Sequence, residues 1–267
     1  MATFYDCKLF YYVVFVTIGE QRIINIIMRR LLVILMLLNY SNMYGMAPKL
    51  NWDKAIENAI TRYGLQMEPN LIKLFSKSGV AYPPSDVALL AFKQERHIQL
   101  WAKDSNSSWR YIHTYPLTAF SGRLGPKLKE HDRQIPEGVY RLTTLNPFSS
   151  MHLSMMINYP NSFDRLQASR DGRGQLGSNI FLHGKSLSVG CLAVGDKAID
   201  QLFLLVHRVG LTHVRLIIAP NDLRNSKPAT ANFAQPRWLP ELYQQLTQAL
   251  RPFPLSKTSI QKMRSSG

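Results

Sequence analysis

Residues 179–196 read NIFLHGKSLSVGCLAVGD and pass from a strand-like run through a glycine-containing loop to the start of a helix. The apolar run Asn179–His183 predicts a strand. The loop leads through Ser188-Val189-Gly190-Cys191 to a helix that we expect over Asp196–Val209, with Asp196 as its N-cap. One short segment therefore carries a histidine at a strand end and a cysteine in the loop before a helix.

This histidine and this cysteine have the chemistry of a nucleophile and its base. A thiol attacks as the thiolate, so it needs a base or a positive field close by. His183 lies eight positions before Cys191, and Gly190 leaves room beside the sulfur for a substrate carbonyl and backbone N–H groups. The alternative interpretation is a structural histidine beside a small buried cysteine. The flanking glycines favour catalysis, as does the small number of thiols, because Cys7 is the only other cysteine.

These residues match a family pattern. His183-Gly184 followed by Ser188-x-Gly190-Cys191 resembles the active-site signature of the YkuD-type L,D-transpeptidases, bacterial cell-wall enzymes with a catalytic cysteine. The resemblance extends upstream to Ser121-Gly122 and to residues 132–140 (DRQIPEGVY), which are similar to the substrate-side loop of that family and to its Pro-x-Gly-x-Tyr/Phe turn. It covers the chain from about Glu95 to Pro220.

The chain departs from the family pattern at two positions near the cysteine. Val189 stands where His or Lys is typical, and Ala193 stands where Arg is typical. Fewer residues than usual also separate the histidine from the cysteine. This short loop, the stretch Ser121–Lys127 (SGRLGPK) and Asn158-Tyr159-Pro160-Asn161 instead resemble a divergent branch from Gram-negative bacteria. One member of that branch resembles a periplasmic murein amidase that releases the outer-membrane lipoprotein from peptidoglycan.

The resemblance implies a role for each matched residue. Cys191 would be the nucleophile that forms a thioester, and His183 the base that takes the thiol proton. The Gly190 and Cys191 N–H groups would bind the oxyanion, with Ser188 and Gly184 supporting the loop. The residues implied on the substrate side are Arg133, Ser121 and Gly122. Three further basic residues could bind a stem-peptide carboxylate or simply face solvent: Arg123, Lys127 and Arg173. No metal and no organic cofactor is implied.

The function implied is cysteine-dependent acyl transfer on peptidoglycan stem peptides. Transpeptidation and hydrolysis share the acyl-enzyme and differ in whether an amine or water resolves it, so both stay open, the latter including release of a peptidoglycan-linked lipoprotein. The alternative from another class is a non-catalytic wall-binding module on the same fold. A nucleic-acid partner is not expected, since no known binding motif or basic helix is present.

Short strand-like segments outnumber helices along the chain. We expect a mainly β fold, a sandwich or barrel with flanking helices, α+β overall. Helical patterns are expected over Asn51–Ser78, with a stop at Gly64, and over Trp238–Leu250. Asp164-Arg165 and residues 167–175 (QASRDGRGQ) are expected to form a mobile flap beside the site. The expected strands are Ala88–Phe92, His97–Ala102, Arg110–Thr118, Val139–Thr143, Met151–Ile157, Asn179–His183 and His213–Ala219.

Composition narrows the class of protein. Of 267 residues, 46% are hydrophobic and 18% charged, which excludes an intrinsically disordered chain. A mean hydropathy of −0.12 excludes a polytopic membrane protein. The excess of 32 Lys+Arg over 17 Asp+Glu gives a net charge of +15 and favours an anionic partner.

The N-terminal region has the order of a secretory signal peptide. Met28-Arg29-Arg30 is positively charged, Leu31–Leu38 is an unbroken apolar run, and small residues follow up to Ala47. That run is shorter than the ~20 residues that span a bilayer. We expect translation to begin at Met28, after residues 1–27, and the protein to reside in the periplasm. Its only membrane contact would be an uncleaved signal.

We therefore divide the chain into four segments. They are an export signal or anchor (1–47), a helical prefix (48–86), an L,D-transpeptidase-like catalytic domain (87–222), and a C-terminal helix with a disordered basic tail (223–267).

Overall fold

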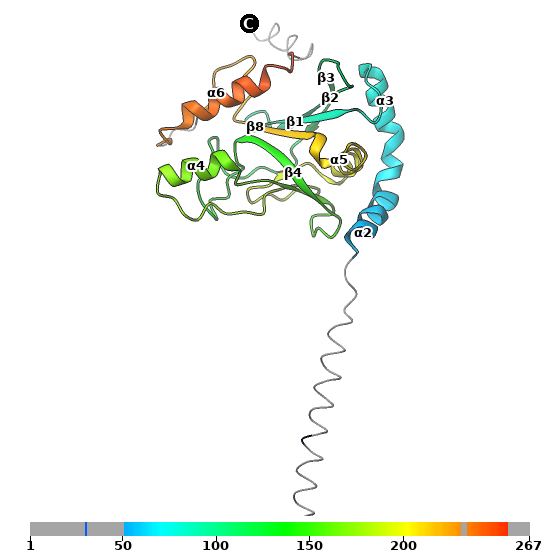
Figure 1. Cartoon of the computed structure of the whole chain (residues 1–267), viewed down its shortest axis with the longest axis horizontal. Helices are drawn as coiled ribbons and strands as arrows, with labels where there is room; N and C mark the ends of the chain where they lie inside the picture. The colour runs from blue at the N-terminus through cyan, green and yellow to red at the C-terminus, as the bar shows by residue number, and fades with distance from the viewer. Residues whose placement is uncertain (1–29, 31–50, 231–233, 256–267) are drawn as a thin grey trace, which may run out of the picture. The chain divides into compact units, whose positions relative to one another are not determined.

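The structure is a computed structural model that describes residue 30, residues 51–230 and residues 234–255 (Figure 1). The predicted export signal, apart from Arg30, and the predicted basic tail from residue 256 lie outside these residues. The described residues from Trp52 onwards belong to one compact unit. Within the described part of the chain, no helix has both the length and the apolar character needed to cross a bilayer.

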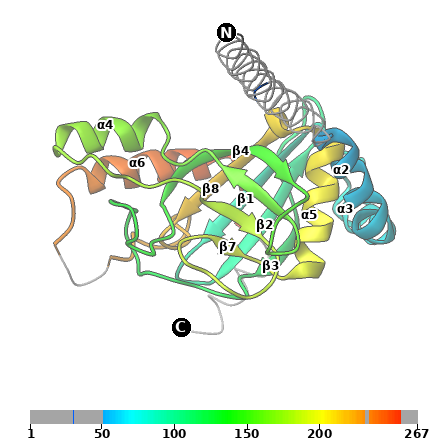
Figure 2. The same ribbon diagram turned by 90° about the horizontal axis from the view of Figure 1, so that it is seen from below.

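A single mixed sheet organises the described residues, with eight strands in the order β3-β2-β1-β8-β4-β5-β6-β7. Neighbouring strands are antiparallel except for the pairs β1–β8 and β6–β7. The sheet curls (Figure 2), and helices pack on both of its faces. The prediction of a mainly β, barrel-like fold with flanking helices is confirmed. The strands are β1 (Asp86–Phe92), β2 (His97–Lys103), β3 (Arg110–Pro116), β4 (Gly138–Asn146), β5 (Ser154–Ile157), β6 (Phe181–His183), β7 (Leu192–Ala193) and β8 (Val214–Ala219).

The central strand β1 shows how the core is divided. Its sequence, DVALLAF, is apolar at successive positions because helices cover both faces of the sheet there. Val87, Leu89 and Ala91 pack in the core that contains α5 (Asp196–Val209), while the alternate residues pack in the core that contains α6 (Leu239–Leu250). Both helices were predicted from their apolar spacing.

The helical prefix packs on the α5 side of the sheet. It runs through α2 (Trp52–Ala59), the π-helical turn η1 (Ile60–Gly64), the 3₁₀ turn η2 (Leu65–Met67) and α3 (Glu68–Ser78). The predicted stop at Gly64 is wrong, because Gly64 keeps a right-handed helical φ of −80°. A Cβ at Gly64 would lie 3.2 Å from Leu204 Cβ, so this glycine permits the close approach of η1 to α5.

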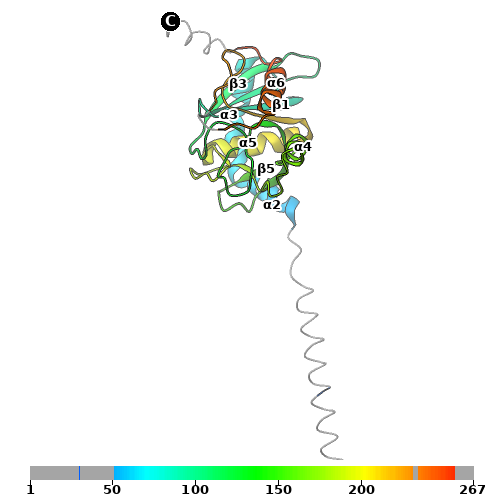
Figure 3. The same ribbon diagram turned by 90° about the vertical axis from the view of Figure 1, so that its left-hand side faces the viewer.

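A helix that the sequence did not indicate, α4 (Ser162–Arg170), occupies much of the expected flap. The flap prediction is therefore wrong for Asp164-Arg165 and for residues 167–170. A ring contact between Phe163 and Trp238 and a hydrogen bond from Gln167 to Glu241 join α4 to the region of α6. Both helices lie on the side of the sheet away from α5 (Figures 1 and 2), which is the side that faces the viewer in Figure 3.

Candidate active site

His183 and Cys191 line the same pocket, which has a volume of about 430 Å³. His183 ends β6 and is in register with Ala193 of the parallel strand β7. Cys191 directly precedes β7 and lies two residues before Ala193. Since alternate residues share a face of a strand, Cys191 and His183 lie on the same face of this strand pair. Short strand pairing thus brings the predicted nucleophile and base to one cavity.

The hydrogen bonding of His183 selects its tautomer. Its Nδ1 lies 2.6 Å from the Gly184 carbonyl oxygen. A carbonyl oxygen only accepts hydrogen bonds, so Nδ1 carries the hydrogen and the Nε2 lone pair is left to accept a proton. The side chain is buried, and this burial lowers the pKa of His183, against the opposing effect of the Gly184 carbonyl. Near neutral pH the imidazole is therefore uncharged, as a general base must be.

The Cys191 thiol is half-buried, with its Sγ 3.9 Å from the Asn179 carbonyl oxygen. Burial raises the pKa of Cys191, while the positive charge of Lys127 acts in the opposite direction with a smaller effect. The resting thiol is therefore protonated near neutral pH. Its activation requires a base that removes the proton as the sulfur attacks.

A chain of hydrogen bonds holds the loop that carries Cys191. The Ser188 hydroxyl donates to the Cys191 carbonyl oxygen at 2.7 Å, and Ser188 Oγ lies 2.9 Å from Ser121 Oγ. Because the one hydroxyl hydrogen of Ser188 is used, Ser121 must donate to Ser188. Ser121 Oγ in turn accepts from the Gly190 N–H at 2.7 Å. The Gly190 N–H, which the resemblance assigned to the oxyanion, is thus already committed to Ser121.

Ser121 and Gly122, which are predicted on the substrate side, border the nucleophile loop, and Ser121 is hydrogen-bonded to it. Gly122 has a φ of +76°, and a Cβ on it would lie 2.1 Å from Gln134 Oε1. The buried Gln134 side chain accepts from the Arg123 N–H and donates to the carbonyl oxygens of Arg123 and Gly125. Gln134 is a supporting residue that our sequence analysis did not single out, although it lies within the stretch that carries the resemblance.

The other basic candidates have different environments. Arg133 is exposed, and its carbonyl carbon lies 3.7 Å from the position of a Cβ on Gly190, so it borders the nucleophile loop. Lys127 is buried and forms an ion pair with Asp132 at 2.6 Å. Arg173 pairs with Asp171 at 3.0 Å. Lys127 and Arg173 are therefore engaged within the protein. Arg123 and Arg173 line a separate pocket of about 510 Å³.

The loop between β6 and β7 is attached to the start of α5. Asp196 was predicted as the N-cap of this helix, but the N-cap is Gly195, whose φ is +81°. The Asp196 carboxylate instead accepts from the Lys185 N–H at 2.7 Å. Gly184 lies against it, since a Cβ on Gly184 would be 2.7 Å from Asp196 Oδ1. Gly184 thus leaves no room for a side chain between the loop and Asp196.

Three other histidines contact carboxylates within the protein. His152 Nε2 lies 2.7 Å from Asp200 Oδ1, and His207 and His213 contact Glu57 and Asp86. In the part of the chain that the structure describes, no group of three or more His, Cys, Asp or Glu side chains is arranged to hold a metal ion.

Comparison with known proteins matches residues 86–216 to the YkuD family model, described as the L,D-transpeptidase catalytic domain. The chain is 32% identical over 124 residues to the protein named "Putative L,D-transpeptidase YafK" from Escherichia coli strain K12, and to its namesake from Escherichia coli O157:H7. Each match covers 46% of this chain and 48% of the relative. The chain thus spans about half the length of these curated relatives.

Two kinds of solved structure also match. The helical cell shape determining protein Pgp2 from Campylobacter jejuni is 18% identical, with a TM-score of 0.42 over 62% of this chain and 58% of that one. Bd1075 from Bdellovibrio bacteriovorus is 23% identical, with a TM-score of 0.37 over 64% of this chain and 58% of that one.

Proposed function

We propose that this chain, whose residues 86–216 belong to the YkuD family of L,D-transpeptidase catalytic domains, is an acyl transferase. It would transfer acyl groups of peptidoglycan stem peptides through a thioester on Cys191. The observation that carries this proposal is the shared pocket of Cys191 and His183, together with the tautomer that leaves His183 Nε2 free. A protonated thiol and a neutral imidazole that line the same pocket suit general-base activation of a nucleophile.

The proposed reaction has two halves. In the first, His183 Nε2 takes the thiol proton as Cys191 Sγ attacks an amide carbonyl carbon, and the developing oxyanion is stabilised by the Cys191 N–H. The C–N bond then breaks, the imidazolium returns the proton to the leaving amine, and a thioester remains. In the second half, an amine or water attacks the thioester, giving transpeptidation or hydrolysis, and the thiol regains its proton.

Intact-protein mass spectrometry tests the nucleophile. The full chain is incubated with soluble muropeptides and stopped in acid, which preserves thioesters. We expect a covalent increment on the wild-type chain and none on Cys191→Ala, with a much smaller increment on His183→Ala. The peptides released then show whether an amine or water resolves the thioester. Equal muropeptide turnover by Cys191→Ala and wild type would overturn the proposal.

A wall-binding module without catalysis is the second candidate. It is favoured by Ala193, which stands where the family pattern carries an arginine. This candidate predicts that the chain sediments with purified sacculi while neither the wild type nor Cys191→Ala changes their composition.

We place the reaction in the periplasm, as the order of charged, apolar and small residues up to Ala47 predicts. This segment lies outside the described residues apart from Arg30, so the support is the sequence pattern alone. Fractionation of cells that produce the full chain tests the location, and recovery with the cytoplasmic fraction would contradict it.

A further inference from the structure

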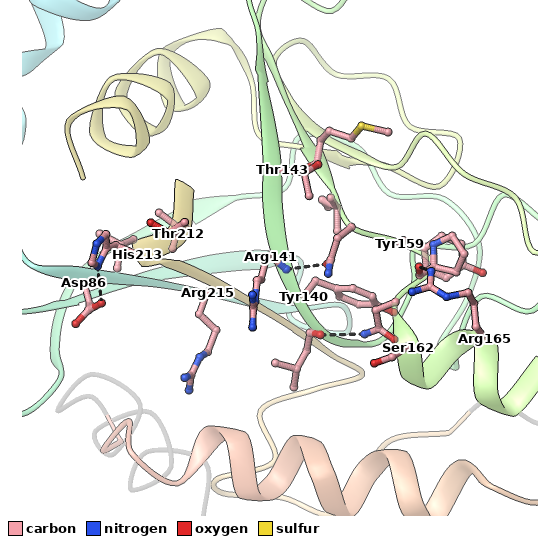
Figure 4. A pocket seen from close by; sticks show the side chains of 18 of the residues that line it. Asp86, Tyr140, Arg141, Thr143, Tyr159, Ser162, Arg165, Thr212, His213 and Arg215 are labelled. Carbon is pink, nitrogen blue, oxygen red and sulfur yellow. Dashed lines mark hydrogen bonds and ion pairs between the residues drawn. The ribbon is translucent and has the colours of Figure 1, made fainter. Parts of the chain in front are cut away.

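A second pocket, of about 930 Å³, lies on the sheet beside α4 (Figure 4). Its floor is formed by outward-facing residues of β4 and β8, beyond the part of the sheet face that α6 covers. The charged side chains that line it are three arginines and one aspartate, together with His213. The arginines are Arg141, Arg165 and Arg215, and the aspartate is Asp86.

Arg141 and Arg215 are direct partners across the antiparallel pair β4–β8. Like charges opposite each other on neighbouring strands destabilise a sheet. Both side chains are exposed on the same side of the sheet (Figure 4), and neither has an ion-pair partner within the described ranges of the chain. An anion bound between them would relieve this repulsion, and two guanidinium groups side by side suit carboxylate oxygens.

The aspartate of the pocket does not neutralise this pair. Asp86 is engaged by Lys103 at 3.3 Å and by His213 at 3.3 Å. Arg165 donates to the Pro160 carbonyl oxygen, which holds its positive group at the α4 end of the pocket. The field over Arg141 and Arg215 is therefore positive.

The arginine pocket adjoins the pocket of Cys191 along β5. Met156 lines the first pocket and Ser154 lines the second, and these alternate residues share one face of the strand. Met156 is also the register partner of Phe181, which lines the Cys191 pocket. An extended peptide advances about 3.3 Å per residue, so a few residues are enough to join the two pockets.

We propose that Arg141 and Arg215 form a subsite for carboxylates of the same wall peptide whose acyl carbon reaches Cys191. This inference rests on the proposed function for the identity of the ligand. The subsite gives the chain a way to orient an anionic peptide although Ala193 supplies no positive charge beside the nucleophile.

Binding without turnover tests the subsite. In the full chain carrying Cys191→Ala, the dissociation constant for soluble muropeptides is measured by calorimetry with and without Arg141→Gln/Arg215→Gln. We expect the double substitution to weaken binding by about tenfold or more, since hydrogen bonds between charged groups are lost. The control is Lys73→Gln/Lys77→Gln, which removes the same two charges from α3 and is expected to leave binding within about twofold.

Amidation of the muropeptide carboxylates gives a second, independent measurement. It should weaken binding to the arginine-containing chain but leave the Arg141→Gln/Arg215→Gln chain unaffected, because the two changes remove the same interaction. The subsite would be overturned if the double variant and its control bound muropeptides equally. It would also be overturned if the double substitution weakened binding to anionic lipid vesicles but not to muropeptides. If the arginines control binding but the wild type forms no thioester, the subsite stands and the acyl-transfer proposal alone fails.

Discussion

At the scale of single residues, burial sets the protonation states of the two proposed catalytic groups. It lowers the pKa of His183 and raises the pKa of Cys191, so both groups are neutral near pH 7. In this respect the pair differs from a preformed thiolate–imidazolium pair, in which a positive field holds the cysteine ionised. The contact of Nδ1 with the Gly184 carbonyl then determines which ring nitrogen receives the thiol proton.

The pH dependence of acylation follows from these shifts. The reactive form needs a neutral His183 and a protonated Cys191, so the rate should rise through the His183 pKa and fall through the Cys191 pKa. We expect the acid limb below the ordinary histidine value of about 6.5 and the alkaline limb above the ordinary cysteine value of about 8.5. Initial rates of thioester formation across pH measure both limbs. A single rise with a midpoint above 6.5 would contradict this assignment.

A side chain at Gly190 is expected to destabilise the protein. Its φ is +106°, and a Cβ would lie 3.1 Å from the Gln134 carbonyl oxygen. Gly190→Ala should lower the free energy of unfolding by about 1–3 kcal/mol and slow acylation, because the backbone beside Cys191 must shift. Denaturant unfolding measures the first effect. Gly174→Ala is the matched control, since its Cβ would meet nothing within 4 Å and the expected change is within about 0.5 kcal/mol. Equal stability of the two variants would contradict the prediction.

Local sequence pattern was informative where interacting residues are close along the chain. His183 and Cys191 were found because one short segment carries both. The hydrogen bond from Gly190 to Ser121 joins residues 69 positions apart, and no local pattern reports that contact. The resemblance therefore singled out Ser121, but its contact with the nucleophile loop became visible only in the structure.

At the scale of elements, α4 is stabilised by its first turn more than by an apolar face. Asn161 and Asp164 form a capping box, in which the Asp164 N–H donates to Asn161 Oδ1 at 3.0 Å and the Asn161 N–H donates to Asp164 Oδ2 at 2.9 Å. The residues of α4 that are buried are Gln167 and Ala168, so apolar spacing gave no helical signal. The two-residue strand β7 escaped prediction for a related reason, because two residues show no periodicity.

The capping carboxylate makes stability depend on pH. Burial raises the pKa of Asp164 to about 6, against the opposing effect of its hydrogen bonds from Asn161 and Tyr140. The folded state thus binds a proton that the unfolded state releases, and stability from this group increases as pH falls through about 6. We expect the free energy of unfolding of the wild type to rise relative to Asp164→Asn as the pH is lowered from about 7 to about 5.

Asp171→Asn provides a control with the opposite sign. A hydrogen bond from Trp238 lowers the pKa of the exposed Asp171, so the stability it contributes is lost as pH falls through that lowered value. The wild type should therefore not gain stability relative to Asp171→Asn on acidification. Urea unfolding at each pH measures both differences, and parallel curves for the two variants would contradict the Asp164 assignment.

At the scale of the whole molecule, one buried ion pair joins the sheet to the loop that supports the nucleophile. Lys93 follows β1, and its Nζ lies 3.0 Å from Glu137 Oε1, with both side chains fully buried. Lys93 also donates to the carbonyl oxygens of Gly125 and Ile135, and Glu137 accepts from the Gly125 N–H. Glu137 lies close enough to Tyr243 of α6 to contribute to raising the pKa of that phenol, after burial. The sheet, the 121–138 loop and α6 therefore meet at this pair.

Breaking this pair should affect both stability and catalysis. Lys93→Met leaves the Glu137 carboxylate buried without its cation, and we expect a loss of about 3–5 kcal/mol in the free energy of unfolding. The double variant Lys93→Met/Glu137→Leu removes the charge as well, so it should recover part of that loss, by about 0.5–3 kcal/mol. The partly exposed pair of Lys103 and Asp86 is the control, and Lys103→Met should lower the free energy of unfolding by at most about 1 kcal/mol.

Because the 121–138 loop carries Ser121 and Gln134, we also expect thioester formation to fall in Lys93→Met under conditions where the variant is still folded. Additive losses in the double variant, measured by denaturant unfolding, would show that the two side chains act independently and that the loop is held by other contacts.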